Sequence, residues 1–335
     1  MAELMAGLKP LLELMSDGAV HSGEALGEAL GVSRAAVWKQ LQKLEKLDLE
    51  VVAVRGSGYR LAAPLDLIDE VALCNQLASA GLGAVELNLC SVVGSTNQEA
   101  LAWAESAPFD STYAVLAEQQ LAGRGRRGRS WVSPYAANLY LSLVASFSGG
   151  AAALEGLSLA VGVAVRRALL RFGCSAQLKW PNDILCDGEK LGGILLEMTG
   201  DPVGDCRVVV GIGINITMPS SAAEAIDQPW TDLAAQLNEL PSRTDLAAAI
   251  IEEVVKVTTN YQREGFKAWR QEWLDANAYN GQQVMLRGPG LNSAGVMVGV
   301  DETGALLLQS NEGRVERIIG GEVSLRTSQQ GGSDE

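Results

Sequence analysis

The spacing of apolar residues changes twice along this chain, and these changes limit the fold more than any single motif does. Up to residue 64 two short helical stretches precede a hairpin pattern; from about Leu65 apolar strands alternate with helical stretches; after Trp273 short apolar runs alternate with turns. With 335 residues, 47% of them hydrophobic, the chain is long enough for two or three domains. We therefore predict an α+β multidomain protein with domains at residues 1–64, 65–272 and 273–326. A polar, glycine-rich tail at residues 327–335 is expected to be disordered.

The first segment has the pattern of a winged helix-turn-helix. In "GAVHSGEALGEALGVSRAAVWKQLQKLEKL" a tight turn at residues 31–32 separates two short helices, and Ser33 is placed to cap the second. In that second helix Val37, Leu41 and Leu44 recur at helical spacing and face a core. The next stretch, "LEVVAVRGSGYRL", predicts a hairpin that forms a basic wing. The candidate DNA-binding residues are Ser22, Ser33, Arg34, Lys39, Lys43, Arg55 and Arg60. A small helical packing domain with a solvated basic face is the alternative.

Charge restricts where DNA could bind. The whole chain carries a net charge of -14, which opposes indiscriminate binding to phosphates. Residues 1–64 hold 7 Lys/Arg and 8 Asp/Glu, a net of -1, so the remaining residues carry -13. Any DNA contact is therefore expected in the first segment.

The middle segment predicts a mixed α/β or α+β domain. Its strand candidates are residues 112–120, 138–146, 176–180, 192–198 and 206–216, and its helix candidates are residues 96–106 and 155–173. Glycines inside these strands, at positions 192, 193, 211 and 213, indicate either a groove where a ligand approaches the backbone or bulges in a twisted sheet. In the last segment five short strands separated by turns predict a small β-barrel.

The stretch "GRGRRGRS" at residues 123–130 loosely fits two phosphate-binding templates, the dinucleotide fingerprint and the P-loop. Both templates need a helix directly after the glycines, whereas "SWVSPYAANLYLSLV" predicts a loop and a strand. The remaining interpretation is a loop, mobile when empty, whose arginines bind a carboxylate or phosphate. A basic surface loop that binds nothing is the alternative.

Two further clusters could contribute to a site. In "KWPND", Lys179 ends a strand with Asn182 and Asp183 in the following turn, and we expect it to be the only cation of its cluster. In "GSTNQEA", Ser95 or Thr96 is expected to cap a helix at its positive end. Taken alone, the lysine could be merely solvated and the cap an ordinary one.

Several classes of chemistry are excluded. The single histidine, His21, lies in the first segment, so neither a catalytic triad nor a histidine-rich metal site is available to the middle domain. The five cysteines include no C-x-x-C pair and are expected to be buried thiols. The N-terminus lacks a signal-peptide pattern and no stretch is long enough to span a bilayer, so we expect a cytoplasmic protein without membrane contact. Such a middle domain suits nucleotidyl transfer to a carboxylate, which needs cations and positioning.

The motifs "STNQ", "GRGRRGR", "KWPND", "KLGGIL" and "GIGIN", preceded by "SRAAVWK", resemble those of the bifunctional biotin protein ligases that also repress the biotin operon. The resemblance covers nearly the whole chain. It implies a winged helix, a biotin/lipoate ligase-like catalytic domain and an SH3-like C-terminal barrel. It also implies that biotin and MgATP form biotinyl-5'-AMP, which then acylates a lysine of the biotin carboxyl carrier protein of acetyl-CoA carboxylase. No tightly bound prosthetic group is implied, and the magnesium ligands stay unknown.

The resemblance assigns roles to individual residues. Lys179 and Arg126 are the implied catalytic residues. The implied biotin-binding residues are Ser95, Thr96, Asn97, Gln120, Arg124, Gly125, Arg126 and Lys179. The implied ATP and adenylate residues are Arg124, Arg126, Arg129, Trp131, Lys179 and Asn215. Operator DNA and a homodimer promoted by biotinyl-5'-AMP are the other implied partners. A lipoate or octanoate ligase with an unrelated DNA-binding domain is the alternative function.

Overall fold

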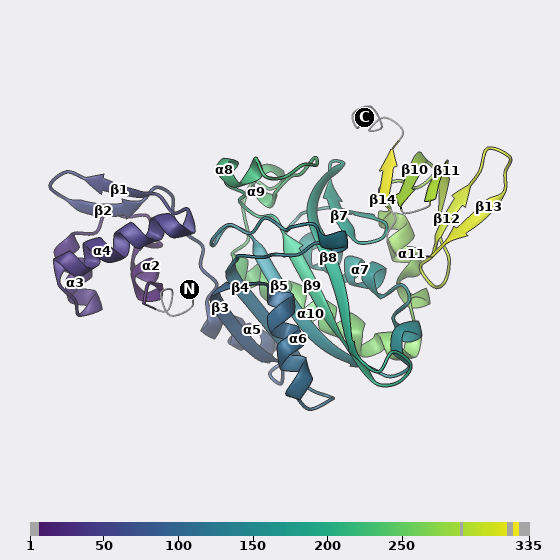
Figure 1. Cartoon of the computed structure of the whole chain (residues 1–335), viewed down its shortest axis with the longest axis horizontal. Coiled ribbons are helices and arrows are strands. Elements are labelled where there is room, and N and C mark those ends of the chain that lie inside the picture. The colour runs from purple at the N-terminus through teal and green to yellow at the C-terminus, as the bar shows by residue number, and fades with distance from the viewer. Residues whose placement is uncertain (1–6, 289–290, 320–323, 328–335) are drawn as a thin grey trace.

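The computed structural model describes residues 7–288, 291–319 and 324–327. Figure 1 shows a small helical body at the N-terminus, a large central sheet flanked by helices, and a group of short strands toward the C-terminus. Among the residues described, no helix is long and apolar enough to cross a lipid bilayer. Of the predicted disordered tail, Thr327 belongs to the last strand, and residues 328–335 lie outside the described part of the chain.

The N-terminal body is a winged helix-turn-helix, as predicted. Its elements are α2 (Lys9–Met15), α3 (Gly23–Leu30), α4 (Arg34–Leu44), a 3-10 turn (Glu45–Leu47) and the antiparallel hairpin of β1 (Val51–Val54) and β2 (Gly58–Leu61). The hydroxyls of Ser22 and Ser33 accept hydrogen bonds from the amides of Ala25 and Ala36, at 3.0 and 3.2 Å. Between the helices Gly31 takes a φ of +66°, the left-handed conformation that glycine tolerates best.

The central sheet has seven strands in the order β3-β4-β5-β9-β8-β7-β6, and only β3 and β4 run parallel. The strands are β3 (Glu86–Val93), β4 (Tyr113–Gln120), β5 (Leu139–Phe147), β6 (Gln177–Lys179), β7 (Asp183–Cys186), β8 (Glu189–Gly200) and β9 (Cys206–Ile214). Every predicted strand is present. One detail was wrong: Asp183 begins β7, because it pairs with Lys179 across the antiparallel β6–β7 ladder.

Helices cover both faces of this sheet, which explains why its central strands β4, β5 and β9 are almost continuously buried. In β4, Ala114 and Leu116 pack in the core with α7 (Leu157–Leu170) and α10 (Arg243–Glu264), whereas Tyr113 and Val115 pack against α6 (Thr96–Ser106). The remaining helices are α5 (Glu70–Ser79), α8 (Ser220–Ala223), α9 (Leu233–Gln236) and α11 (Lys267–Ala276), with 3-10 turns at Arg126–Gly128 and Gly150–Leu154. On its face of the sheet α6 contacts β4, β5, β8 and β9.

The C-terminal strands form an antiparallel sheet in the order β13-β12-β11-β10-β14. They are β10 (Gln283–Gly288), β11 (Leu291–Val300), β12 (Leu306–Gln309), β13 (Val315–Ile318) and β14 (Ser324–Thr327). This sheet is joined to the central domain by a buried contact, in which the Trp180 indole donates to the Gly304 carbonyl at 3.0 Å.

The expectation that the cysteines are buried thiols was only partly right. All five are free; Cys174, Cys186 and Cys206 are buried, but Cys90 is half-buried and Cys74 is exposed. The sequence pattern could not separate these positions, because Cys74 lies on an amphipathic helix whose buried side chains are Leu73 and Leu77.

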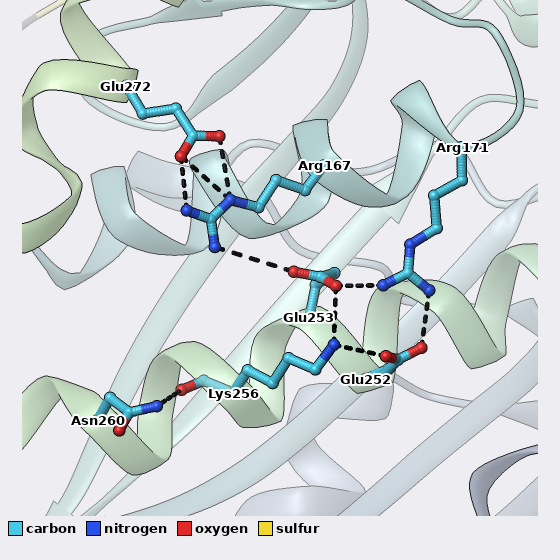
Figure 2. Close-up of polar contacts among 7 residues, drawn as sticks. All are labelled: Arg167, Arg171, Glu252, Glu253, Lys256, Asn260 and Glu272. Atoms are coloured by element: carbon cyan, nitrogen blue, oxygen red, sulfur yellow. Dashed lines mark hydrogen bonds and ion pairs between the residues drawn. The ribbon is translucent and has the colours of Figure 1, made fainter. Parts of the chain in front are cut away.

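An ion-pair network joins α7 to α10 and α11 (Figure 2). Its centre is Glu253, whose side chain is 8% exposed and which pairs with Arg171, with Lys256 at 3.2 Å and with Arg167 at 4.0 Å. Arg167 also binds Glu272 of α11, at 2.6 Å. Because three helices contribute charges, the network fixes their relative positions behind the sheet.

Glu252 of α10 belongs to the same network. It accepts hydrogen bonds from Arg171 at 2.7 Å and from Lys256 at 2.5 Å. The Arg171 guanidinium and then the Lys256 ammonium lower the pKa of Glu252 to about 2, from an ordinary value of 4.5. A carboxyl group whose pKa is lower in the folded protein stabilises the fold above its unfolded pKa, and this contribution is lost as the pH falls through the folded pKa.

We therefore predict that Glu252→Gln lowers the free energy of unfolding at neutral pH by on the order of 1 kcal/mol, since both cations are partly exposed and screened. The difference from the wild type should shrink as the pH falls from 4.5 toward 2. Urea unfolding across this range measures it, with the exposed Glu239→Gln as the matched control. A deficit that stays constant into acid would show that the charge of Glu252 is not responsible.

Candidate active site

A cavity of about 1040 Å³ opens beside the start of α6 and extends over the ends of β6, β7, β8 and β9. Its lining includes all of the residues that the sequence assigns to biotin or to the adenylate: Ser95, Thr96, Asn97, Gln120, Arg124, Gly125, Arg126, Arg129, Trp131, Lys179 and Asn215. These residues come from segments up to 120 positions apart, so the fold collects them from four parts of the chain.

The strand glycines explain how side chains approach the sheet so closely. A Cβ atom at Gly211 would lie 2.2 Å from Asn97 Oδ1, and one at Gly213 would lie 2.5 Å from the Trp131 ring. Both glycines and Gly193 line the cavity, so at these positions they form a groove. Gly192 differs, since it packs on Ile214 and lies at the register shift between β7 and β8.

The end of α6 is capped in a different way from the one predicted. Ser95 occupies the N-cap position, but its side chain makes no capping hydrogen bond. The side chain of Gln120, at the end of β4, supplies the acceptor: the Thr96 amide donates to Gln120 Oε1 at 2.9 Å. The prediction was therefore right about the N-cap position of Ser95 and wrong about the capping bond, because a residue distant in sequence accepts from the first amide of the helix.

The arginine loop folds back across the cavity. Gly125 N donates to Arg129 O at 2.7 Å, which closes the loop on itself. Arg124 pairs with Glu197 of β8 at 2.8 Å, and Arg126 donates to Asn182 Oδ1 at 3.1 Å. Arg129 is exposed at the cavity edge. Two of the loop's arginines thus already point to protein acceptors around the cavity.

Trp131 follows the loop and lies against the glycine-lined part of the sheet. Its indole nitrogen is buried and has no hydrogen-bond partner in the described part of the protein. A buried N–H group without an acceptor is costly, so a ligand that supplied an acceptor there would gain binding energy. The Lys190 ammonium lies 5.6 Å from the centroid of the Trp131 ring, within cation–π range.

The expectation that Lys179 is the only cation of its cluster was wrong. Lys190 Nζ lies 2.7 Å from Asp183 Oδ1, and Lys179 Nζ lies 3.8 Å from Asp183 Oδ2. The aromatic ring of Tyr279 also lies near Lys179, at 5.9 Å from its ammonium. The two lysines share one carboxylate, which leaves a net positive charge at this end of the cavity. Sequence reasoning missed Lys190 because only the register of β7 on β8 brings it to Asp183.

Asn215 also lines the cavity, directly after the end of β9. It is buried, and its side-chain amide donates to the backbone carbonyl of Thr231 at 3.1 Å. That bond holds the segment after α8 against the sheet. The residues of this segment that line the cavity are Ala225, Ile226, Asp227, Gln228, Pro229 and Trp230.

The candidate DNA-binding residues lie on the N-terminal body. Arg34, Lys39 and Arg55 are exposed, and Lys43 is half-buried. The Arg60 guanidinium donates to the carbonyls of Leu61 and Ala62, at 3.0 and 3.2 Å. The hydroxyls of Ser22 and Ser33 accept the capping bonds of their helices.

One residue of this face was missed by the sequence analysis. Trp38 of α4 is 48% exposed, and its ring centroid lies 5.9 Å from that of Tyr59 in the wing. The sequence could have indicated its exposure, because Trp38 is an aromatic residue outside the apolar face formed by Val37, Leu41 and Leu44. It extends the exposed face of α4 toward the wing.

Comparisons with known proteins support each part of this architecture. The family model described as the Biotin/lipoate A/B protein ligase family matches residues 89–215, an HTH domain model matches residues 9–60, and the Biotin protein ligase C terminal domain model matches residues 280–326. The bifunctional ligase/repressor BirA of Escherichia coli (strain K12) is 36% identical over 96% of this chain and 97% of its own length. BirA of Bacillus subtilis (strain 168) is 32% identical over 95% and 98%.

A solved structure agrees with the ligase domains. The biotin protein ligase from Aquifex aeolicus in complex with biotin and ATP is 28% identical, with a TM-score of 0.62, over 72% of this chain and 99% of that chain. The fold and the cavity thus define a ligase that carries a DNA-binding domain. The chain belongs to the family of bifunctional biotin protein ligase/repressors. It is a biotin protein ligase with an N-terminal helix-turn-helix.

We predict that Lys179→Ala lowers the rate of adenylate formation about 10²- to 10³-fold, because removing a preorganised charged group costs roughly this much. Lys190 carries a second charge nearby, and Lys190→Ala should therefore also slow the step. Single-turnover adenylation measures both variants, with Lys267→Ala, an exposed lysine paired to Glu302, as the matched control. Adenylation by Lys179→Ala within a few-fold of wild type would contradict the assigned role.

Proposed function

We propose that this protein joins biotin to ATP in the cavity described above and then transfers biotin to a lysine of the biotin carboxyl carrier protein of acetyl-CoA carboxylase. In the first step the biotin carboxylate attacks the α-phosphorus of ATP and releases diphosphate. In the second, the carrier's lysine amine attacks the acyl carbon and releases AMP. The observation that carries the proposal is the single cavity in which a helix N-terminus, an arginine loop and two lysines meet.

Specific residues are proposed for each part of the substrates. Ser95, Thr96, Asn97 and Gln120 would bind biotin at the positive end of α6. Arg124, Gly125 and Arg126 would close over biotin and the phosphate. These assignments rest on the shared cavity and on the short contacts of its lining.

The nucleotide would occupy the other end of the cavity. Trp131 would lie against adenine, with its buried indole nitrogen meeting an acceptor, and Asn215 would lie beside it. Arg129 would contribute charge from the edge of the cavity. Lys179 would neutralise charge at the junction of carboxyl and phosphate in both steps, as Arg126 would in the first.

Magnesium would enter with ATP. Across the described ranges no group of three His, Cys, Asp or Glu side chains could hold a metal by itself. Mg²⁺ commonly binds through one or two carboxylates together with substrate phosphates. Asp183 and Asp227 are the carboxylates in the cavity lining. Because Asp183 already pairs with two lysines, Asp227 is the side chain that would hold the ion together with the phosphates. The ion would supply charge neutralisation at the triphosphate.

Incubation with ATP labelled at the α-phosphate tests the ligase proposal. We expect labelled biotinyl-5'-AMP with biotin and much less acyl-AMP with lipoate or octanoate, followed by biotin transfer to a purified carrier domain. A carrier domain whose acceptor lysine is replaced by arginine is the control. Preferential activation of lipoate would overturn the proposal in favour of the alternative ligase.

The second activity proposed is repression of the biotin operon. Arg34, Lys39 and Lys43 of α4 and Arg55 of the wing would contact operator DNA, and Arg60 would hold the wing's backbone. Ser22 and Ser33 would act by capping their helices and placing them. Together the two activities need ATP, biotin and DNA within reach of one chain, so we propose that the protein acts in the cytoplasm.

We propose that DNA binding and ligation belong to separate domains, with domains at residues 1–64, 65–272 and 273–326. We predict that a protein starting at Leu65 loses operator binding but keeps measurable adenylation, because the basic residues assigned to DNA all precede this position. Gel shifts at one fixed salt concentration measure the first effect and labelled ATP the second. Operator binding by the shortened protein at full affinity would contradict the assignment.

The proposal also links the two activities through a homodimer that biotinyl-5'-AMP promotes. A ligand that favours the dimer must bind the dimer more tightly, with a coupling of about 1–3 kcal/mol in typical cases. We therefore predict that a non-hydrolysable adenylate analogue tightens self-association roughly tenfold and raises operator affinity. Sedimentation equilibrium with and without the analogue measures the first effect. No change in either constant would mean that the adenylate does not control DNA binding.

A further inference from the structure

We infer that Glu197 is a positioning residue that determines which polar atoms of the cavity lining accept hydrogen bonds from the substrate. It thereby favours a ligand that carries ring N–H groups. The inference rests on the proposed binding of biotin in this cavity, since the ureido ring of biotin carries two N–H groups. Glu197 itself does not line the cavity; it acts through Asn97.

The polar groups form one row across three strands. Ser142 of β5 pairs in register with Gly211 of β9, and Gly211 pairs with Leu195 of β8. Glu197 lies two positions after Leu195 and is therefore on the same face of β8. The side-chain amide of Asn97 lies directly on Gly211, where no Cβ could fit. The row is therefore Ser142, Asn97 and Glu197, beneath the start of α6.

Glu197 fixes the orientation of the Asn97 amide. A carboxylate only accepts hydrogen bonds, whereas an amide has a donor and an acceptor end. Asn97 Nδ2 lies 2.7 Å from Glu197 Oε2, and the same oxygen accepts from Arg124 at 2.8 Å. The amide nitrogen must therefore face Glu197. The amide oxygen is left to face Ser142 Oγ, at 2.6 Å.

That orientation determines the direction of the next bonds. Asn97 Oδ1 cannot donate, so Ser142 must donate its single hydroxyl proton to Asn97 Oδ1. The Oγ atoms of Ser142 and Thr96 are 2.8 Å apart, a distance that suits either direction of donation. Because the proton of Ser142 is already used, Thr96 must donate to Ser142.

The result is an acceptor left open toward the cavity. Gln120 Oε1 already accepts the Thr96 backbone amide at 2.9 Å, and the Thr96 hydroxyl at 3.2 Å is its only other donor among the described residues. With that hydroxyl turned to Ser142, one lone pair of Gln120 Oε1 and the lone pairs of Thr96 Oγ1 have no donor among the described residues. Both residues line the cavity. A ligand with two N–H groups matches this pair of acceptors, and a dithiolane ring such as that of lipoate cannot.

Replacing the carboxylate by an apolar side chain of similar length removes the constraint. In Glu197→Met the Asn97 amide nitrogen loses its acceptor while Arg124 remains a donor, so Asn97 turns its oxygen toward Arg124 and its nitrogen toward Ser142. Ser142 then donates to Thr96, and Thr96 donates to Gln120, so the second lone pair of Gln120 Oε1 is filled. The same change removes the contact with Arg124, so a second variant is needed to separate the two effects.

Ser142→Ala supplies that separation. It breaks the row between Asn97 and Thr96 and leaves the pair of Glu197 and Arg124 in place. The matched control is Glu272→Gln, which removes another carboxylate bound to an arginine but lies on α11, outside the cavity lining. Urea unfolding checks that all three full-length variants are folded.

Calorimetric titration tests the inference with biotin and with the two cyclic carbamate analogues of biotin, in which one ureido N–H is replaced by oxygen. We expect the wild type to bind at least one analogue markedly more weakly than biotin. Both Glu197→Met and Ser142→Ala should weaken biotin binding roughly tenfold, the usual scale for one unmatched buried polar group. The preference for biotin over that analogue should fall by a similar factor in both, and Glu272→Gln should match the wild type.

Three results would overturn the inference. An unchanged preference in Glu197→Met would show that the carboxylate does not set the acceptors. A loss of preference in Glu197→Met but not in Ser142→Ala would assign the effect to the contact with Arg124. Failure of the wild type to bind biotin at all would instead refute the proposed function, and the inference with it.

Discussion

The absence of side chains at two positions of β9 determines how this active site is built. At Gly211 the amide of Asn97 lies on the strand backbone, and at Gly213 the ring of Trp131 does, at distances where a Cβ atom would overlap. The start of α6 and the segment that follows the arginine loop can therefore both contact the backbone of the sheet. Glycine weakens a strand, but here β5 and β8 hold β9 on both sides along its full length.

The chemistry follows from what this close approach brings together. The positive end of α6, the arginine loop and the pair of Lys179 and Lys190 surround one cavity, and the carboxylates Glu197 and Asp183 hold their cations in place. This arrangement suits a reaction in which negative charge is transferred between a carboxylate and phosphates. No histidine is needed, which agrees with the single histidine of the chain lying in the helix-turn-helix.

Much of the fold could be predicted because its signals are local. The serine caps, the alternation of apolar residues and the turn at Gly31 each act within a few residues, and the helices and strands that they predict are present. The substrate-site residues that the compact motifs supply line one cavity, since each motif carries several of them at once. The DNA-binding and substrate roles of these residues stay predictions.

The rest depends on pairings between distant segments. Gln120 caps α6 from β4, Lys190 reaches Asp183 through the register of two strands, and Glu197 meets Asn97 across 100 positions. Nothing in the neighbouring residues distinguishes Glu197 from a solvated glutamate. The predicted capping bond of Ser95 was wrong for the same reason, because a local preference was replaced by a partner that only the folded sheet supplies.

The most direct test is a crystal structure of the full-length protein with a non-hydrolysable analogue of biotinyl-5'-AMP. The account predicts that the biotin ring lies beside Thr96 and Gln120, that the phosphate position lies within hydrogen-bonding distance of Arg126 or Lys179, and that adenine stacks on Trp131. An analogue bound outside this cavity, or bound within it but out of reach of Lys179 and the arginine loop, would contradict the account.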